Sequence, residues 1–195
     1  MKRNLLTPFI AVALSLSPAL FAEQPLSPIP LDKGIPLTAE QDAALDGKFL
    51  DKATRGGLAE IKFSQEVDGR VKRDDIKQFA KMMIADHKDV NKNLTALADK
   101  MKIKLPTDLF TDAQVALDKL KAAADQDIDK MYIDVMVQDH TKAVALFEER
   151  AKNSQNVDIK AFAERTLPGL RTHLAKAQEL QKSFGVGVGA TTPAL

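Results

Sequence analysis

One stretch of this chain, residues 76–101, places inward-facing side chains at alternating spacings of three and four residues. The eight positions are Ile76, Phe79, Met83, His87, Val90, Leu94, Leu97 and Met101. Because an α-helix has 3.6 residues per turn, all eight side chains fall on one face of a helix. His87 is the only polar residue among them. A face this long is stable only when other elements cover it, so the stretch predicts a helical core.

The composition supports an all-helical chain. Aromatic residues make up only 5% of its 195 residues, and the length suits one domain with tails. Cysteine is absent, which excludes disulfides and thiolate ligands. The formal net charge is +1, and it becomes −1 if Lys2 and Arg3 are removed with the first 22 residues. A chain with this charge balance offers no basic surface for nucleic acid.

The first two helices are expected to form a hairpin. Thr38-x-x-Gln41 has the sequence of a capping box and starts the first helix, which Asp68-Gly69 ends. The second helix begins between residues 72 and 75 and stops at Leu105-Pro106. Gly56-Gly57 lies inside the first helix and costs about 1 kcal/mol per glycine in helix propensity. That cost predicts a close approach of a neighbouring helix or a bulky group.

The second pair of helices follows a long connection, residues 103–124, in which Thr111-x-x-Gln114 is expected to cap one short helix. Long helices are expected from about residue 125 to 152 and from a turn at 153–156 to about 184. Pro168-Gly169 predicts a kink or bulge just before His173. Four long helices with two short turns predict a four-helix bundle. The long connection leaves the direction of the third helix relative to the second open.

The two ends of the chain are expected to lie outside the bundle. Residues 1–22 combine a charged start with an apolar run, which predicts a signal peptide cleaved after Ala22, with Ala19 as a competing site. Because Pro8 and Pro18 interrupt the run, an uncleaved membrane anchor is disfavoured, and we expect no stable membrane insertion after cleavage. A Pro-rich linker at 23–37 and a disordered tail at 185–195 would flank the bundle at 38–184. These features predict an exported periplasmic protein, free or associated with the envelope.

All three histidines of the chain lie on inward faces of different predicted helices. M-x-x-D-H occurs twice, ending at His87 and at His140, which are 53 residues apart, and His173 lies in the last helix. At 1.5 Å per residue, the histidines lie between about 17 and 24 Å from the first hairpin turn, in an up-down or a crossover topology. Glu60, the only charge on the inward face of the first helix, lies one to two turns away. The four side chains are therefore expected near one level.

Three imidazoles and one carboxylate form a donor set that suits Zn, Fe, Mn or Cu. The candidate metal ligands are His87, His140, His173 and Glu60. Asp86 and Asp139 precede two of the histidines and are candidates to orient imidazoles, including those on neighbouring helices, by hydrogen bonding. Met83 and Met136 lie one turn before the same histidines and would favour copper, although methionine at an inward position is more often core filler.

Two other interpretations stay open at this stage. The histidine, aspartate and glutamate side chains could form a hydrogen-bonded layer that fixes helix register, or they could perform acid–base chemistry. An unpaired imidazole in a core is costly, and mutual hydrogen bonds do not easily satisfy all three rings. A di-iron site is disfavoured because Ile84, Val137 and Leu170 stand where Glu-x-x-His motifs need glutamate. With no phosphate loop, nucleophile elbow or cysteine nucleophile, we predict no catalytic residues.

Four segments resemble a known family. The segments are FLDKATRGGLAE at 49–60, FAKMMIADH at 79–87, MVQDHTKAVALF at 136–147 and AFAERTLPGLRTHL at 161–174. They are similar to the bacterial domain of unknown function 4142, over about residues 42–182. The resemblance implies an exported, ferritin-like four-helix bundle with Glu60, His87, His140 and His173 at family positions, and it implies no activity. Metal handling, envelope stress protection or a non-catalytic interaction with an envelope protein are the roles expected for such a bundle.

Overall fold

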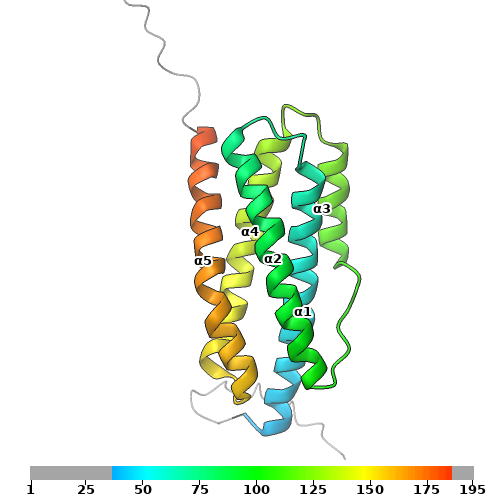
Figure 1. Ribbon diagram of the computed structural model, residues 1–195, viewed down its shortest axis with the longest axis vertical. Helices are drawn as coiled ribbons and strands as arrows, with labels where there is room; N and C mark the ends of the chain where they lie inside the picture. The colour runs from blue at the N-terminus through cyan, green and yellow to red at the C-terminus, as the bar shows by residue number, and fades with distance from the viewer. Residues whose placement is uncertain (1–36, 186–195) are drawn as a thin grey trace, which may run out of the picture. The chain divides into compact units, whose positions relative to one another are not determined.

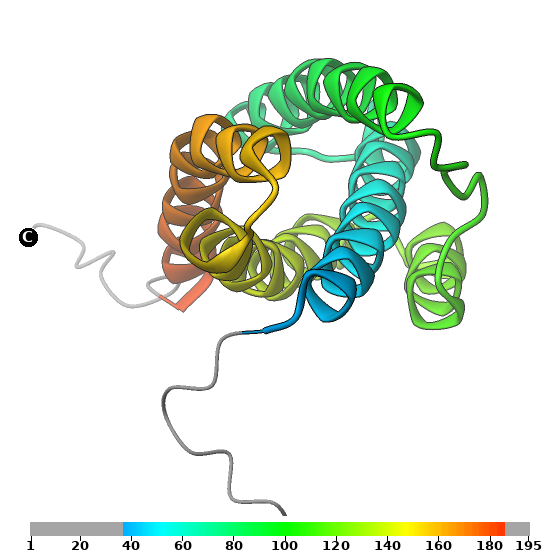
Figure 2. The same cartoon turned by 90° about the horizontal axis from the view of Figure 1, so that it is seen from below.

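The computed structural model describes residues 37–185, and every regular element in that range is an α-helix. The helices are α1 (Ala39–Val67), α2 (Asp74–Lys100), α3 (Thr111–Ala122), α4 (Ile128–Asn153) and α5 (Val157–Gly185). Four long helices lie side by side (Figure 1), and the end view places α3 outside them (Figure 2). The expected all-α four-helix bundle with a short extra helix is confirmed. The predicted signal peptide, nearly all of the linker and the tail after Gly185 lie outside the described residues.

The start of α1 follows the sequence prediction. Thr38 Oγ1 accepts from the Gln41 backbone N–H, and the Gln41 side chain accepts from the Thr38 N–H, so the capping box is present. The turn after α1 uses Gly69 with φ +89°, a conformation that glycine adopts without a Cβ clash.

Several predicted boundaries were wrong. Helix α2 ends at Lys100, before Leu105-Pro106, where Lys102 turns into the left-handed region with φ 57°. The N-cap of α3 is Phe110, and Thr111 is already the first helical residue, so the predicted cap does not form. Helix α4 begins at Ile128, three residues later than expected. Helix α5 continues through Pro168 as α-helix, so the predicted bulge is absent, and the kink predicted as its alternative stays a prediction. Local sequence signals misplaced these helix ends because tertiary contacts also decide where a helix begins and ends.

The direction of α4 relative to α2 is fixed by contacts at the two ends of the bundle. The backbone N–H groups of Lys72 and Arg73, before α2, donate to the Asp129 carboxylate at the start of α4. At the other end, Lys100 at the end of α2 pairs with Asp158 at the start of α5. Helices α2 and α4 therefore run in the same direction, and the segment containing α3 crosses the length of the bundle between them (Figure 1). This is the crossover arrangement of ferritin-like bundles.

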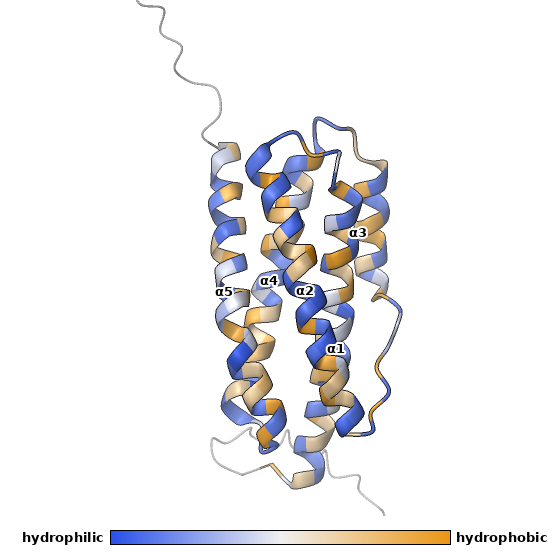
Figure 3. Ribbon diagram, in the orientation of Figure 1, coloured by the Kyte–Doolittle hydropathy of each residue, from blue (hydrophilic) through white to orange (hydrophobic). Residues whose placement is uncertain are grey.

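Two apolar clusters fill the bundle, one toward each end. The first cluster includes Phe63, Phe79 and Tyr132, and the second includes Phe49 and Phe162. Hydrophilic and hydrophobic residues alternate along the same helices (Figure 3), and most of the charged residues are exposed or half-buried. Burial of each large apolar side chain stabilises the fold by about 1.5–3 kcal/mol. The clusters are separated near mid-length, where polar side chains occupy the interior.

The glycine pair in α1 has two different environments. A Cβ at Gly57 would collide with the amide of Asn91 on α2, which confirms the predicted close approach. A Cβ at Gly56 would meet nothing within 4 Å. Only one of the two glycines is therefore required by helix packing.

A buried arginine joins the ends of α1 and α4. Arg150 is 1% exposed, and its Nη1 donates to Asp42 at 3.0 Å and to Asp46 at 3.1 Å. Ser154, the C-cap of α4, also donates to Asp46. The network ties the entry of the first hairpin to the turn of the second.

No helix in the part of the chain that the structure describes is both long and apolar enough to cross a lipid bilayer.

Candidate metal centre

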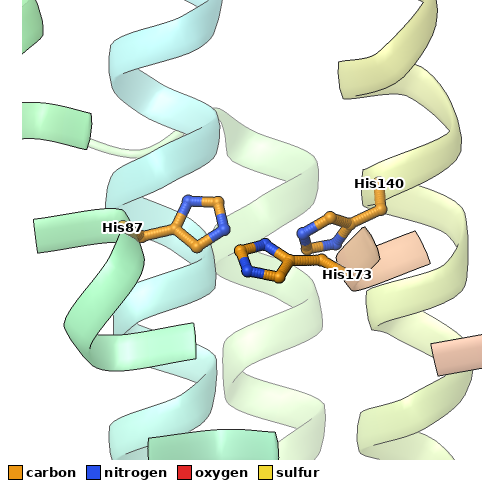
Figure 4. Close-up of side chains that lie close together, drawn as sticks. All are labelled: His87, His140 and His173. Carbon is orange, nitrogen blue, oxygen red and sulfur yellow. The ribbon is translucent and has the colours of Figure 1, made fainter. Parts of the chain in front are cut away.

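His87, His140 and His173 meet in the middle of the bundle. They come from α2, α4 and α5, and their ring centroids are separated by 5.4–5.5 Å. All three side chains are buried, with at most 6% of each residue exposed. Figure 4 shows the three imidazoles directed toward one another from separate helices. Each offers one nitrogen within 4.8 Å of those of the other two.

Glu60 of α1 lies against two of these rings. Its Oε2 is 3.0 Å from His87 Nδ1, and its Oε1 is 3.2 Å from His140 Nδ1. The residue is 3% exposed. The group of ligand atoms within 4.8 Å contains the three histidines and does not include Glu60. The carboxylate therefore contacts the Nδ1 atoms of two imidazoles.

Hydrogen-bond acceptors also lie beside the rings of His140 and His173. His140 Nδ1 donates to the Met136 carbonyl oxygen at 3.0 Å, because a carbonyl can only accept. His173 Nε2 donates to the Asp86 carboxylate at 2.8 Å. Asp86 lies on α2 and His173 on α5, so this bond joins two helices. Asp86 thus orients a histidine on a neighbouring helix.

These contacts leave one nitrogen free on each ring. His87 Nε2, His140 Nε2 and His173 Nδ1 are buried and have no hydrogen-bond partner among the described residues. Where the other nitrogen of a ring donates its proton, the free nitrogen carries a lone pair. Three buried ring nitrogens without partners are costly unless something binds them. The arrangement matches the one in which second-sphere acceptors orient metal-binding imidazoles.

Burial also sets the protonation of the cluster. It lowers the pKa of His87 well below the usual value, with His140 and His173 adding to the effect. The same cause lowers the pKa of His140 to about 4. Burial raises the pKa of Glu60 well above its usual value, and nearby Asp139 raises it further. The imidazoles of His87 and His140 are therefore neutral near pH 7, which is the form that binds a metal ion.

The separation of the rings is compatible with a metal centre after small side-chain movements. Bonds of about 2.0–2.1 Å to histidine nitrogens in a tetrahedral site place the nitrogens about 3.3 Å apart. Nitrogens within 4.8 Å of one another reach that separation by rotation of the imidazoles about their χ angles. Three protein ligands leave a fourth position of a tetrahedral ion for another donor.

The remaining predicted residues are placed differently. Asp139 contacts Lys142 at 3.6 Å. Among the described residues, Asp139 makes no hydrogen bond to a histidine. Met83 and Met136 are both fully buried in the apolar cluster beside Phe79 and Tyr132. The sequence reasoning missed Asn91, one turn after His87, whose amide atoms are buried and have no partner among the described residues. Its spacing of four from His87 was the available signal.

Two cavities reach the histidines from the surface. One, of about 480 Å³, is bordered by α1, α3 and α4 and reaches Glu60 and His87. The other, of about 410 Å³, lies between α2 and α5 and reaches His87 and His173. Asp86 and Asp89 line the second cavity, so acidic groups stand on the path from solvent to the imidazoles.

Comparisons with known proteins agree with this fold. The crystal structure of a DUF305 fragment from Deinococcus radiodurans is similar to the chain, with a TM-score of 0.64 and 9% sequence identity. The match covers 76% of this chain and 99% of that one, and at this identity it shows a shared fold alone. No curated protein matches the sequence.

A protein-family model matches most of the chain. The model of the domain of unknown function DUF4142 matches residues 36–180, which contain all four long helices up to the last turn of α5 and all three histidines. The match confirms the resemblance seen in the four sequence segments. The chain belongs to the DUF4142 family.

Proposed function

We propose that this protein binds one divalent transition-metal ion through His87, His140 and His173 and serves in metal handling in the periplasm. The observation that carries the proposal is the set of three buried imidazole nitrogens without hydrogen-bond partners, one from each histidine. Each histidine lies on its own helix, so one ion would also hold three helices together. Imidazole donors suit zinc, copper and iron.

Glu60 and Asp86 would support the ion from outside the ligand set. Glu60 lies against Nδ1 of His87, the Met136 carbonyl oxygen accepts from Nδ1 of His140, and Asp86 accepts from Nε2 of His173, so every ring has an acceptor behind it. A divalent ion between the rings would favour the ionised form of Glu60, because the positive charge compensates the buried carboxylate. Such carboxylate–histidine pairs fix ring orientation and raise the basicity of the ligand nitrogen.

The proposal includes export of the protein to the periplasm. The charged start and apolar run of the first 22 residues support this export. A periplasmic bundle with a buried ion would store, deliver or remove metal there, and protection of the envelope from metal stress would follow from that activity.

Elemental analysis tests the proposal. The mature protein would be purified from periplasm without a histidine tag or chelator, and its metal content measured by mass spectrometry beside a His87→Gln/His140→Gln double variant. We expect close to one ion per chain in the wild type and none in the double variant. A folded wild-type protein that contains no metal and takes up no Zn, Cu, Fe or Mn would overturn the proposal. The polar layer would then serve helix register, with the function on the surface.

A further inference from the structure

Each of the two cavities that approach the histidines reaches a carboxylate that contacts one of the rings. The cavity bordered by α1, α3 and α4 reaches Glu60, whose Oε2 lies 3.0 Å from His87 Nδ1. The cavity between α2 and α5 reaches Asp86, whose Oδ2 accepts from His173 Nε2 at 2.8 Å. An ion that comes from the solvent through either cavity must therefore pass one of these two contacts.

Exposure to solvent separates the two contacts. The Glu60 side chain is 4% exposed, whereas the Asp86 side chain is 49% exposed. Glu60 cannot leave His87 without displacing the side chains packed around it. Asp86 can rotate into solvent and exchange its hydrogen bond with His173 for hydrogen bonds to water. The contact between Asp86 and His173 is therefore the one that opens at the lower cost.

The three histidines also differ in how close they lie to the cavity between α2 and α5. The side chain of His173 is 7% exposed, that of His87 is 3% exposed and that of His140 is 0% exposed. His173 and His87 line this cavity, and His140 lines neither of the two cavities. An ion that enters between α2 and α5 therefore meets His173 first and His140 last.

Oxygen donors follow the α2 wall of the same cavity. Asp86, Asp89 and Asn93 line it at spacings of three and four residues, so they lie along one face of α2. Carboxylate and amide oxygens bind divalent cations, so these side chains can replace water molecules of a hydrated ion in steps. Arg165 on the α5 wall is exposed, and its long side chain can extend into solvent.

Helix α5 leaves space beside this cavity. Gly169 lines it, and a Cβ at that position would meet nothing within 4 Å. Pro168 has no N–H, so α5 lacks one backbone hydrogen bond directly before Gly169. The missing bond lowers the cost of a local movement of α5, about one turn before His173. Both features make the α5 side of the cluster easy to open.

We propose that the metal ion enters and leaves the histidine cluster through the cavity between α2 and α5, and that the contact between Asp86 and His173 opens to admit it. This inference rests on the proposed metal centre. Rotation of Asp86 into solvent releases the His173 ring, which binds the arriving ion before His87 and His140 complete the site. The cavity that reaches Glu60 does not carry the ion.

Two glycine variants test the route, because each adds the same side chain to one cavity. Gly169→Leu fills the cavity between α2 and α5, and Gly56→Leu fills the one that reaches Glu60. A Cβ meets nothing within 4 Å at either position, so both variants are expected to fold. Circular dichroism and melting temperatures check this expectation.

Stopped-flow absorbance measures zinc exchange in both directions. Metal-free protein takes zinc from a weak chromophoric indicator, and zinc-loaded protein loses it to an excess of a strong chromophoric chelator. We expect Gly169→Leu to slow uptake and release by the same factor, at least about tenfold, because a narrowed route raises the barrier without changing either end state. The dissociation constant of zinc should stay the same. Gly56→Leu should exchange zinc at the wild-type rates.

A second pair of variants approaches the cavity from the α2 wall. Asn93→Phe adds a ring to the lining, and Lys92→Phe adds the same ring at the neighbouring exposed position, which lines neither cavity. We expect slower zinc uptake in Asn93→Phe and unchanged uptake in Lys92→Phe. This pair keeps the test decisive if Gly169→Leu does not fold.

The uptake rates decide the outcome. Wild-type uptake in folded Gly169→Leu or Asn93→Phe would overturn the route, and so would equal slowing in Gly56→Leu. In these cases zinc still binds to the wild type, so the proposed function would stand. A wild-type protein that takes up no zinc would overturn the proposed function and this route together.

Discussion

Glu60 Oε2 lies 3.0 Å from His87 Nδ1, and both residues are buried, in the interval between the two apolar clusters of the bundle. The opposite oxygen of the same carboxyl group lies 3.2 Å from His140 Nδ1. A single side chain on α1 thus contacts two candidate ligands on α2 and α4. The candidate metal centre therefore involves all four long helices, with three supplying imidazoles and the fourth supplying the group behind two of them.

Replacement of this carboxylate tests its orienting role. We expect Glu60→Gln to weaken zinc affinity by about ten- to a hundredfold, the usual effect of losing a second-sphere partner. Competition with a chromophoric chelator measures the affinity. Glu66→Gln is the matched control on the same helix, where Glu66 pairs with Arg70 away from the histidines. Equal affinity in Glu60→Gln and the wild type would show that the carboxylate does not act on the ligands.

Asp86 tests the contact to the third histidine. We expect Asp86→Ala to weaken zinc binding by about tenfold or more, because His173 loses the acceptor that orients its ring. Asp89→Ala removes a neighbouring acid that lines the same cavity but makes no hydrogen bond to His173 in the described structure. The same loss in both variants would indicate a general effect of charge at the cavity, in place of an effect on ring orientation.

Removal of metal is expected to destabilise the bundle. An ion at a free concentration of a hundred times its dissociation constant stabilises the native state by about 2.7 kcal/mol. Addition of a chelator to the zinc-loaded wild type should therefore lower the melting temperature. The same chelator should leave a His87→Gln/His140→Gln/His173→Gln variant unchanged. An unchanged wild type would favour a purely structural role for the histidines.

Acid should destabilise the metal-free protein through His140. Its pKa of about 4 in the native state lies below the usual 6.5, so the unfolded chain takes up the proton first. Stability from the neutral ring is present above pH 6.5 and is lost as the pH falls toward 4. Between pH 7.5 and pH 5 the loss amounts to about 2 kcal/mol. Because the raised pKa of Glu60 acts in the opposite direction over this range, the contribution of His140 is measured as the difference between the wild type and His140→Gln in urea unfolding at both pH values, and His140→Gln should lose less stability.

The buried arginine gives a prediction that is independent of metal. Arg150→Met leaves Asp42 and Asp46 as buried acids without their shared partner, so we expect a loss of about 3–5 kcal/mol in the free energy of unfolding. Arg171→Met, which removes an exposed pair with Glu148, should cost less than about 1 kcal/mol. Denaturant unfolding of both variants measures the difference. Similar losses would mean that the buried network contributes no more than a surface pair.

Much of the fold could be predicted because helix periodicity is a local property. The face from Ile76 to Met101 and the capping box at Thr38 depend on residues within a few turns of one another. The direction of α4 could not be predicted from such signals. It depends on contacts between distant residues, such as the Asp129 carboxylate with the backbone of Lys72.

The candidate site divides in the same way. Mid-helix spacing placed His87, His140 and His173 near one level, and the structure has them at one level. The positions of the acids follow from tertiary packing, so the sequence did not assign Asp86 to His173. Arg150 was missed because its partners lie more than a hundred residues away in the chain.

The measurement that tests the metal centre most directly is anomalous X-ray scattering from crystals of the zinc-loaded protein, recorded on both sides of the zinc absorption edge. We expect one strong anomalous peak per chain, about 2.0–2.1 Å from His87 Nε2, His140 Nε2 and His173 Nδ1. Crystals of the His87→Gln/His140→Gln variant should lack that peak. Well-ordered wild-type crystals with no peak between the three rings, or with zinc only at surface acids, would contradict the proposed centre.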